Sequence, residues 1–427
     1  MSVPRLLPGV MALVSALFAH AAPDTLPEPL TLRAALAALV PDHPDLARAD
    51  AESALARAER DAAEARYGLS ATLEAEARYI DPSPLAPDPD HNDSRAGLEL
   101  RRRFYDFGRT AALHAAGEAL VGSRAERARA AWQARRLDVM ARFFDVLLAD
   151  LAFRVQDEAM AIAYVRLDRA RDRHELGQVS DIELLEFETR YQEVREARFA
   201  AQARQRVSRV QLAEALGRPG AMPSVLIEPD LSAVLARAQP EVTAMMAEVA
   251  ADSPELRALR IELAAAEARR EAAMAQNRPV LSGRIGSYRY SRDFGSRDRW
   301  RAGIILEWPF HDGGRRQAAT AAAQAERDRL AAELRARESA LRSRVAELVE
   351  RLAVLRAARD AARTRSDYRE LYLDRSRALY EMEVATDLGD AMVLSTEARL
   401  RQAEADYAYW LAWAELDALR GRLGEEP

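Results

Sequence analysis

The sequence predicts a mainly α-helical chain with a small β part, built from two copies of one hairpin-plus-long-helix unit. Short motifs recur at an offset of about 206 residues, because Asp106–Arg109 returns as Asp312–Arg315 and Ser180–Asp181 returns as Thr386–Asp387. Two long segments lack proline and show helical spacing of apolar residues. Three short segments alternate apolar with polar residues, as strands do, and a fourth is more mixed.

The first 21 residues are typical of a cleavable secretory signal. Arg5 precedes an apolar stretch from Leu6 to Ala19, and small residues flank His20, which predicts cleavage after Ala21. No later run of about 20 apolar residues occurs, so we expect no transmembrane helix, and any part within a membrane must consist of β-strands. The chain has no cysteine, which excludes disulfides and a lipid-bearing N-terminal cysteine.

The charge pattern argues against a nucleic-acid-binding protein. The 62 basic residues, all of them arginine, are interleaved with 68 acidic ones, and the net charge is -6. A nucleic-acid site requires a concentrated basic face, so no such partner is expected. The six histidines form no pair with metal-ligand spacing, and no catalytic constellation is visible. We therefore predict no enzyme activity, no cofactor and no metal site.

The repeat predicts the division of the exported chain into residues 22–250 and 251–427. The first repeat is expected to contain a helix, a β-hairpin at about 70–104, a long helix at about 110–176, a helix at about 181–217 and a linker. The second is expected to contain a helix, a β-hairpin at about 279–309, a long helix at about 315–380 and a helix at about 387–421.

Alternation gives each expected strand an apolar and a polar face. In the last strand Trp300, Ile304 and Trp308 share the apolar face, while charged residues lie on the other. At about 3.3 Å per residue the two tryptophans lie roughly 26 Å apart, close to the apolar height of a membrane barrel with aromatic girdles at both rims. We expect this face to contact lipid.

Four strands cannot close a transmembrane barrel, for which at least eight are needed. A single sheet would also leave two strand edges in lipid, where their backbone groups find no water to bind. The barrel must therefore be shared between chains, and four strands from each of three protomers would close a barrel of twelve.

The two long helices would each span about 65 residues, or about 100 Å at 1.5 Å per residue. In the second, Leu341, Val345 and Leu348 begin a heptad pattern that is typical of coiled coils. The shorter helices, stacked end to end, would match the long ones in an elongated coiled-coil tube. Gly108 and Gly314 are expected at the sharp corners between strand and long helix, because glycine adopts conformations that other residues avoid.

Several motifs, in one order and doubled at one offset, resemble those of the TolC-type outer-membrane factors. The opening helix of that family is similar to Leu30–Leu36 followed by His43–Leu46. Its two strand-to-helix corners resemble Phe104–Arg109 and Trp308–Arg315. Its helix-turn-helix tip resembles Glu175–Leu185.

The resemblance implies a homotrimer in the outer membrane of a Gram-negative bacterium, with a helical tunnel through the periplasm. It also implies tips that dock on a periplasmic adaptor, the membrane fusion protein, while an inner-membrane pump supplies the energy. The tip and gate residues would be Gly177, Ser180, Asp181, Glu381, Glu383, Thr386 and Asp387. Ducts of this kind pass drugs, metal ions and secreted peptides, and specificity generally lies with the pump.

The residues of the first tip agree with the helix-turn-helix that the resemblance implies. Gly177 can end one helix, and Ser180 with Glu183 has the spacing of a capping box that starts the next. The second tip departs from the family, because Glu383 stands where glycine is usual. The tip carboxylates could form threefold rings that gate the pore, or they could cap helices in solvent.

The loop of the first hairpin contains a weak metal-site pattern. Asp88–Asp93 with Glu99 resembles a calcium loop but lacks its turn glycine.

The residues are also compatible with a second class of protein. A periplasmic coiled-coil adaptor or a structural envelope protein would share the signal and the long helices. Such a protein has no need of a lipid-facing band, so the alternating strands favour the exit duct of a tripartite efflux or type I secretion system.

Overall fold

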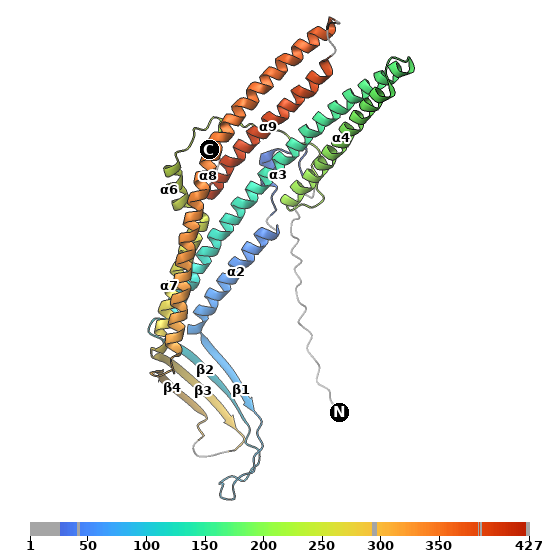
Figure 1. Ribbon diagram of the computed structural model, residues 1–427. Helices are drawn as coiled ribbons and strands as arrows, with labels where there is room; N and C mark the ends of the chain where they lie inside the picture. Colours follow the sequence, from blue (N-terminus) through green and yellow to red (C-terminus); the bar gives the residue numbers. More distant parts are fainter. Residues whose placement is uncertain (1–25, 41–42, 293–296, 383, 385–386, 424–427) are drawn as a thin grey trace, which may run out of the picture.

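The structure, a computed structural model, describes residues 26–40, 43–292, 297–382, 384 and 387–423. The molecule is elongated, with a β-sheet at one end and the tips of long helices at the other (Figure 1). The expected mainly α-helical class with a small sheet is confirmed. Within the described residues, no helix combines the length and apolar character needed to cross a membrane.

The elements of the first half include one β-hairpin and one long helix. They are α1 (Leu32–Ala37), α2 (Pro44–Glu64), the short 3-10 turn η1 (Ala65–Tyr67), β1 (Leu69–Glu76), β2 (Arg95–Tyr105), α3 (Arg109–Glu175) and α4 (Asp181–Ala215). A linker follows that contains α5 (Ser232–Leu235) and α6 (Val242–Asp252).

The second half repeats this order. Its elements are α7 (Pro254–Met274), the 3-10 turn η2 (Ala275–Asn277), β3 (Val280–Tyr290), β4 (Trp300–Glu307), α8 (Arg315–Glu381) and α9 (Leu388–Leu419). The two long helices α3 and α8 each have 67 residues, and α2 and α7 each have 21. At about 1.5 Å per residue the long helices extend about 100 Å, as the sequence predicts.

The strands form one antiparallel sheet in the order β1-β2-β3-β4. The hairpins of the two halves join through β2 and β3, where Glu99 lies opposite Gly286 and Leu100 opposite Ile285. The register shifts between Arg103 and Tyr105, near the helices, and Tyr105 then pairs with Leu281. Within the chain, β1 and β4 therefore lie at the two edges of the sheet.

The helices pack in pairs along the long axis (Figure 1). On α3, α2 lies along the half nearest the sheet and α4 along the half nearest the tip. On α8, α7 and α9 are arranged in the same way. Because α7 also contacts α3 and α9 contacts α3, the two halves pack side by side.

The large buried side chains concentrate where α1 and the linker close onto the long helices. Phe144 of α3 stacks on Tyr407 of α9 with ring centroids 4.4 Å apart, and both are almost fully buried. A second cluster joins Leu348 of α8 to Trp413 of α9. Since α9 contributes to both clusters, they connect α3 of the first half to α8 and α9 of the second half.

Candidate functional site

One face of the sheet is apolar and uncovered. Leu73, Trp300 and Ile304 are 77%, 71% and 74% exposed, respectively. The strand register places them on the same face, since paired residues of an antiparallel sheet share a side. Among the strand residues of that face, the charged ones are Arg102, in the same cross-strand row as Ile304, and Arg289, near the loop end of the sheet. The face is thus mainly apolar and bears two arginines.

Trp308 lies one residue beyond the strand in which the sequence analysis places it. The last strand ends at Glu307, and the N–H of Phe310 donates to the carbonyl of Trp308 in a turn. Pro309 explains the early end, because proline has no N–H to offer a strand ladder. Trp308 is 61% exposed and close to the corner with α8.

The opposite face of the sheet is polar. Its charged strand residues are Glu74, Glu76, Arg95, Glu99, Arg101, Arg103, Arg284, Arg301 and Glu307. Tyr288 lies flat on this face and is 8% exposed. Glycine at position 97 makes this possible, because a Cβ there would overlap the tyrosine ring. The mixed pattern of β3 left this tyrosine unrecognised in the sequence, and the nearby glycines are the signal that could have found it.

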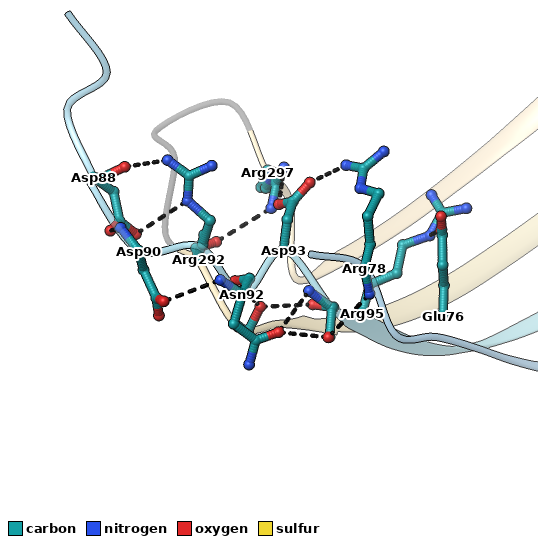
Figure 2. A network of polar contacts seen from close by, with 11 residues as sticks. Glu76, Arg78, Asp88, Asp90, Asn92, Asp93, Arg95, Arg292 and Arg297 are labelled. Atoms are coloured by element: carbon teal, nitrogen blue, oxygen red, sulfur yellow. Dashed lines mark hydrogen bonds and ion pairs between the residues drawn. The ribbon is translucent and has the colours of Figure 1, made fainter. Parts of the chain in front are cut away.

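The two loops at the far end of the sheet are clamped together by arginine (Figure 2). Asp93, which is 4% exposed, accepts from Arg78 and also pairs with Arg297 at 2.8 Å between Oδ1 and Nη2. Arg292 donates to the carbonyl oxygen of Asp88, and the Nε atom of Arg292 lies 3.8 Å from Oδ2 of the same aspartate. Guanidinium groups thus surround the segment that resembles a calcium loop. Among the described residues no group of three or more potential metal ligands occurs.

The corners between strand and long helix use left-handed backbone in both halves. Gly108 and Gly314 have φ of 95° and 89° and precede α3 and α8, respectively. The residues before them, Phe107 and Gly313, also have positive φ. An L residue in this region costs about 1–2 kcal/mol, which explains glycine at the corners.

An aspartate caps the long helix at each corner, but the two differ in burial. Asp106 is 1% exposed and accepts from the N–H and hydroxyl of Thr110 and from the hydroxyl of Tyr67 at 2.8 Å. Asp312 is half-buried and accepts from the N–H groups of Gly314 and Arg316. The first corner is therefore the more tightly held.

The first tip joins α3 to α4 through two complementary caps. Gly177 has φ of 69°, and the N–H of Gln178 donates to the carbonyl of Arg173, which closes α3 in a Schellman motif. Ser180 and Glu183 form a capping box at the start of α4. The hydrogen bonds from the N–H and hydroxyl of Ser180 lower the pKa of Glu183. Asp181 lies 2.7 Å from His174 across the turn, its side chain 90% exposed.

The second tip closes its long helix with an equivalent bond. The N–H of Val384 donates to the carbonyl of Leu379, at positions offset by 206 from the bond at the first tip. Glu381 is the last residue of α8, and the carboxylate of Asp387 accepts from Tyr372 at 2.7 Å. This bond raises the pKa of Tyr372. Glu383 and Thr386 lie outside the described residues.

A contact that the sequence did not predict links the two tips. Arg166 of α3 pairs with Asp390 of α9 at 2.6 Å between Nη2 and Oδ2. It joins the α3–α4 pair to the α8–α9 pair close to the tips. No local signal identifies it, since both helices are covered with arginine and carboxylates.

Solved structures of membrane proteins have a fold similar to that of this chain. The fold is similar to a membrane protein from Pseudomonas aeruginosa, with a TM-score of 0.74 and 20% identity over 91% of this chain and 90% of that chain. It is also similar to the outer membrane protein VceC from Vibrio cholerae, with a TM-score of 0.70 and 17% identity over 92% and 96%. The CmeC outer membrane channel from Campylobacter jejuni gives a TM-score of 0.72 and 13% identity over 92% and 86%.

No curated protein sequence matches the chain. The family model described as outer membrane efflux protein matches residues 37–218 and 245–422, most of both repeats. This confirms the resemblance drawn from the tip and corner motifs. The chain belongs to the outer membrane efflux protein family.

Proposed function

We propose that three copies of this chain form the exit duct of a tripartite efflux or type I secretion system in the outer membrane. The observation behind this proposal is the four-stranded sheet with one apolar, uncovered face and two edges that no other described strand pairs. In lipid, each unpaired backbone group at such an edge costs several kcal/mol. The sheet therefore needs strands from other copies.

The sheet is suited to closure by copies of itself. Its four strands alternate in direction, so β1 and β4 are antiparallel to each other. The β4 edge of one copy can therefore pair with the β1 edge of the next in the antiparallel manner used throughout the sheet. Repetition of this step leads to a closed barrel without free edges.

The polar face favours three copies over two. Eight strands make a barrel whose interior is just wide enough for side chains to fill. This polar face bears nine charged residues per chain, and arginine and glutamate side chains require water or paired partners. Twelve strands leave an aqueous lumen in which these side chains are solvated.

The helical end is proposed to dock on a periplasmic adaptor. Its tip exposes apolar residues beside the turn, with Ile182 at 80% and Leu185 at 60%. The gate role of Gly177, Ser180, Asp181, Glu381 and Asp387 belongs to the same proposal, and so does that of Glu383 and Thr386. The chain itself is a passive duct without catalytic function, and an inner-membrane pump drives the solute. A periplasmic adaptor or structural envelope protein would have no use for the exposed apolar sheet face.

The test is assembly and conductance of the full chain. We expect the protein to be extracted from outer membranes only with detergent, to have the mass of three copies in light scattering, and to conduct ions in planar lipid bilayers. A soluble periplasmic monomer, purified without detergent, would overturn the proposal.

A further inference from the structure

Three arginines gather near one glutamate across β2, β3 and β4. The register aligns Glu99 with Arg301 in one row of the polar face and Arg101 with Arg284 in the adjacent row. We call these four residues the arginine belt. It has three guanidinium groups and one carboxylate, an excess of two positive charges per chain.

The contacts of the belt converge on the single carboxylate. The Oε1 atom of Glu99 lies 3.3 Å from Nη2 of Arg101 and 3.3 Å from Nε of Arg284. Its Oε2 atom accepts from the hydroxyl of Tyr288 at 2.9 Å. Glu99 is therefore shared among several donors and cannot neutralise all the cations that face it.

Tyr288 holds the third arginine. The guanidinium carbon of Arg301 lies 4.4 Å from the centroid of the tyrosine ring, a cation–π contact. The ring also lies close to the backbone at Gly97, where a Cβ would collide with it. A buried aromatic ring thus positions a cation on a face that the proposed assembly turns toward the lumen.

The other charged strand residues of this face, three glutamates and two arginines, carry a net charge of -1. Arg95 pairs with Glu74 at 2.9 Å and with Glu76 at 2.8 Å, toward the loops. Arg103 lies 3.7 Å from the buried Asp106, and Glu307 lies near the helices. The excess of positive charge on the polar face is thus concentrated in the belt.

We propose that the arginine belt makes the barrel prefer anions to cations. The inference rests on the proposed function, because it requires three copies with the polar face inward. Three belts at one height would then present six excess positive charges to the lumen. Rings of arginine select anions in pores, and the planar guanidinium fork matches carboxylate and phosphate groups. The favoured solutes are therefore small anions and compounds with carboxylate or phosphate groups.

The test is the reversal potential of the full-length channel in planar bilayers under a gradient of potassium chloride. We expect the wild type to prefer chloride. Arg284→Gln combined with Arg301→Gln should lower the ratio of chloride to potassium permeability by about fivefold, because six charges are removed close to the ion path. Arg289→Gln is the matched control, since Arg289 also lies on β3 but on the apolar face.

A second variant predicts a change of opposite sign. Glu99→Gln retains an acceptor for Tyr288 but removes the only carboxylate of the belt, so it should raise the permeability ratio. Opposite shifts in the two belt variants exclude general damage to the barrel as the cause. A conducting channel whose ratio is the same in the wild type and in both variants would overturn the inference. Absence of conductance in the wild type would overturn the proposed function and, with it, this inference.

Discussion

The substitution Ile304→Arg tests which face of the sheet meets lipid. Ile304 lies midway between Trp300 and Trp308, roughly 13 Å from each at about 3.3 Å per residue. If the tryptophans mark the two rims of the apolar band, Ile304 lies at the middle of the bilayer. Its neighbour Ile305 has the opposite orientation, because side chains alternate along β4. Ile305→Arg is thus a matched control with the same change one residue away.

The expected energies differ clearly between the two positions. An arginine on the lipid face at the bilayer midplane destabilises a barrel by about 2–4 kcal/mol, and three copies would multiply this to roughly 6–12 kcal/mol per trimer. At the rim the penalty falls to about 0–1 kcal/mol, so Trp300→Arg should have a smaller effect. Ile305→Arg would add one more arginine to a face that already bears five and should change stability little.

Two measurements follow from these energies. We expect Ile304→Arg to be depleted from the outer-membrane fraction and to unfold from lipid vesicles at much lower urea concentration than the wild type. Ile305→Arg should fractionate and unfold like the wild type. The reasoning would be refuted if Ile305→Arg failed to insert while Ile304→Arg inserted normally, because the faces would then be reversed. Equal behaviour of both variants would show that neither face meets lipid at this height.

Further predictions concern the corners and the first tip. Asp106→Ala should lower the free energy of unfolding by about 2–3 kcal/mol, since it leaves buried donors unpaired, whereas Asp312→Ala should cost only about 1 kcal/mol. Equal losses in urea unfolding would contradict the difference in burial. Ser180→Ala should weaken the start of α4 by about 1 kcal/mol, visible as faster amide hydrogen exchange in its first turn. Because the pKa of Glu183 is lowered in the folded tip, its stabilisation is present above its ordinary pKa of 4.5 and is lost as the pH falls through the lowered value. The same amides should therefore exchange faster on acidification relative to their intrinsic rates, and Glu183→Gln should abolish that pH dependence.

Much of the fold was predictable because its signals are local. The corner motifs and the tip motifs recur at the same offset, which predicts two long helices of equal length, and α3 and α8 both have 67 residues. Alternation predicts the apolar faces of β1 and β4 from residues two positions apart. The capping box of Ser180 and Glu183 depends on only four consecutive residues. The strand faces and the capping box arise from neighbours in the chain, and the repeat is visible by comparing short motifs.

Other features depended on how distant segments meet. The pairing of β2 with β3 joins residues almost half the chain apart and makes β1 and β4 the edges of the sheet. It also brings Glu99 to Arg284 and Tyr288, and the packing of helices brings Arg166 to Asp390. Arginine and glutamate are so frequent along this chain that sequence cannot tell which ones pair. The sequence therefore specified the elements and their faces, whereas long-range packing selected the partners, because charge pairing requires proximity in space.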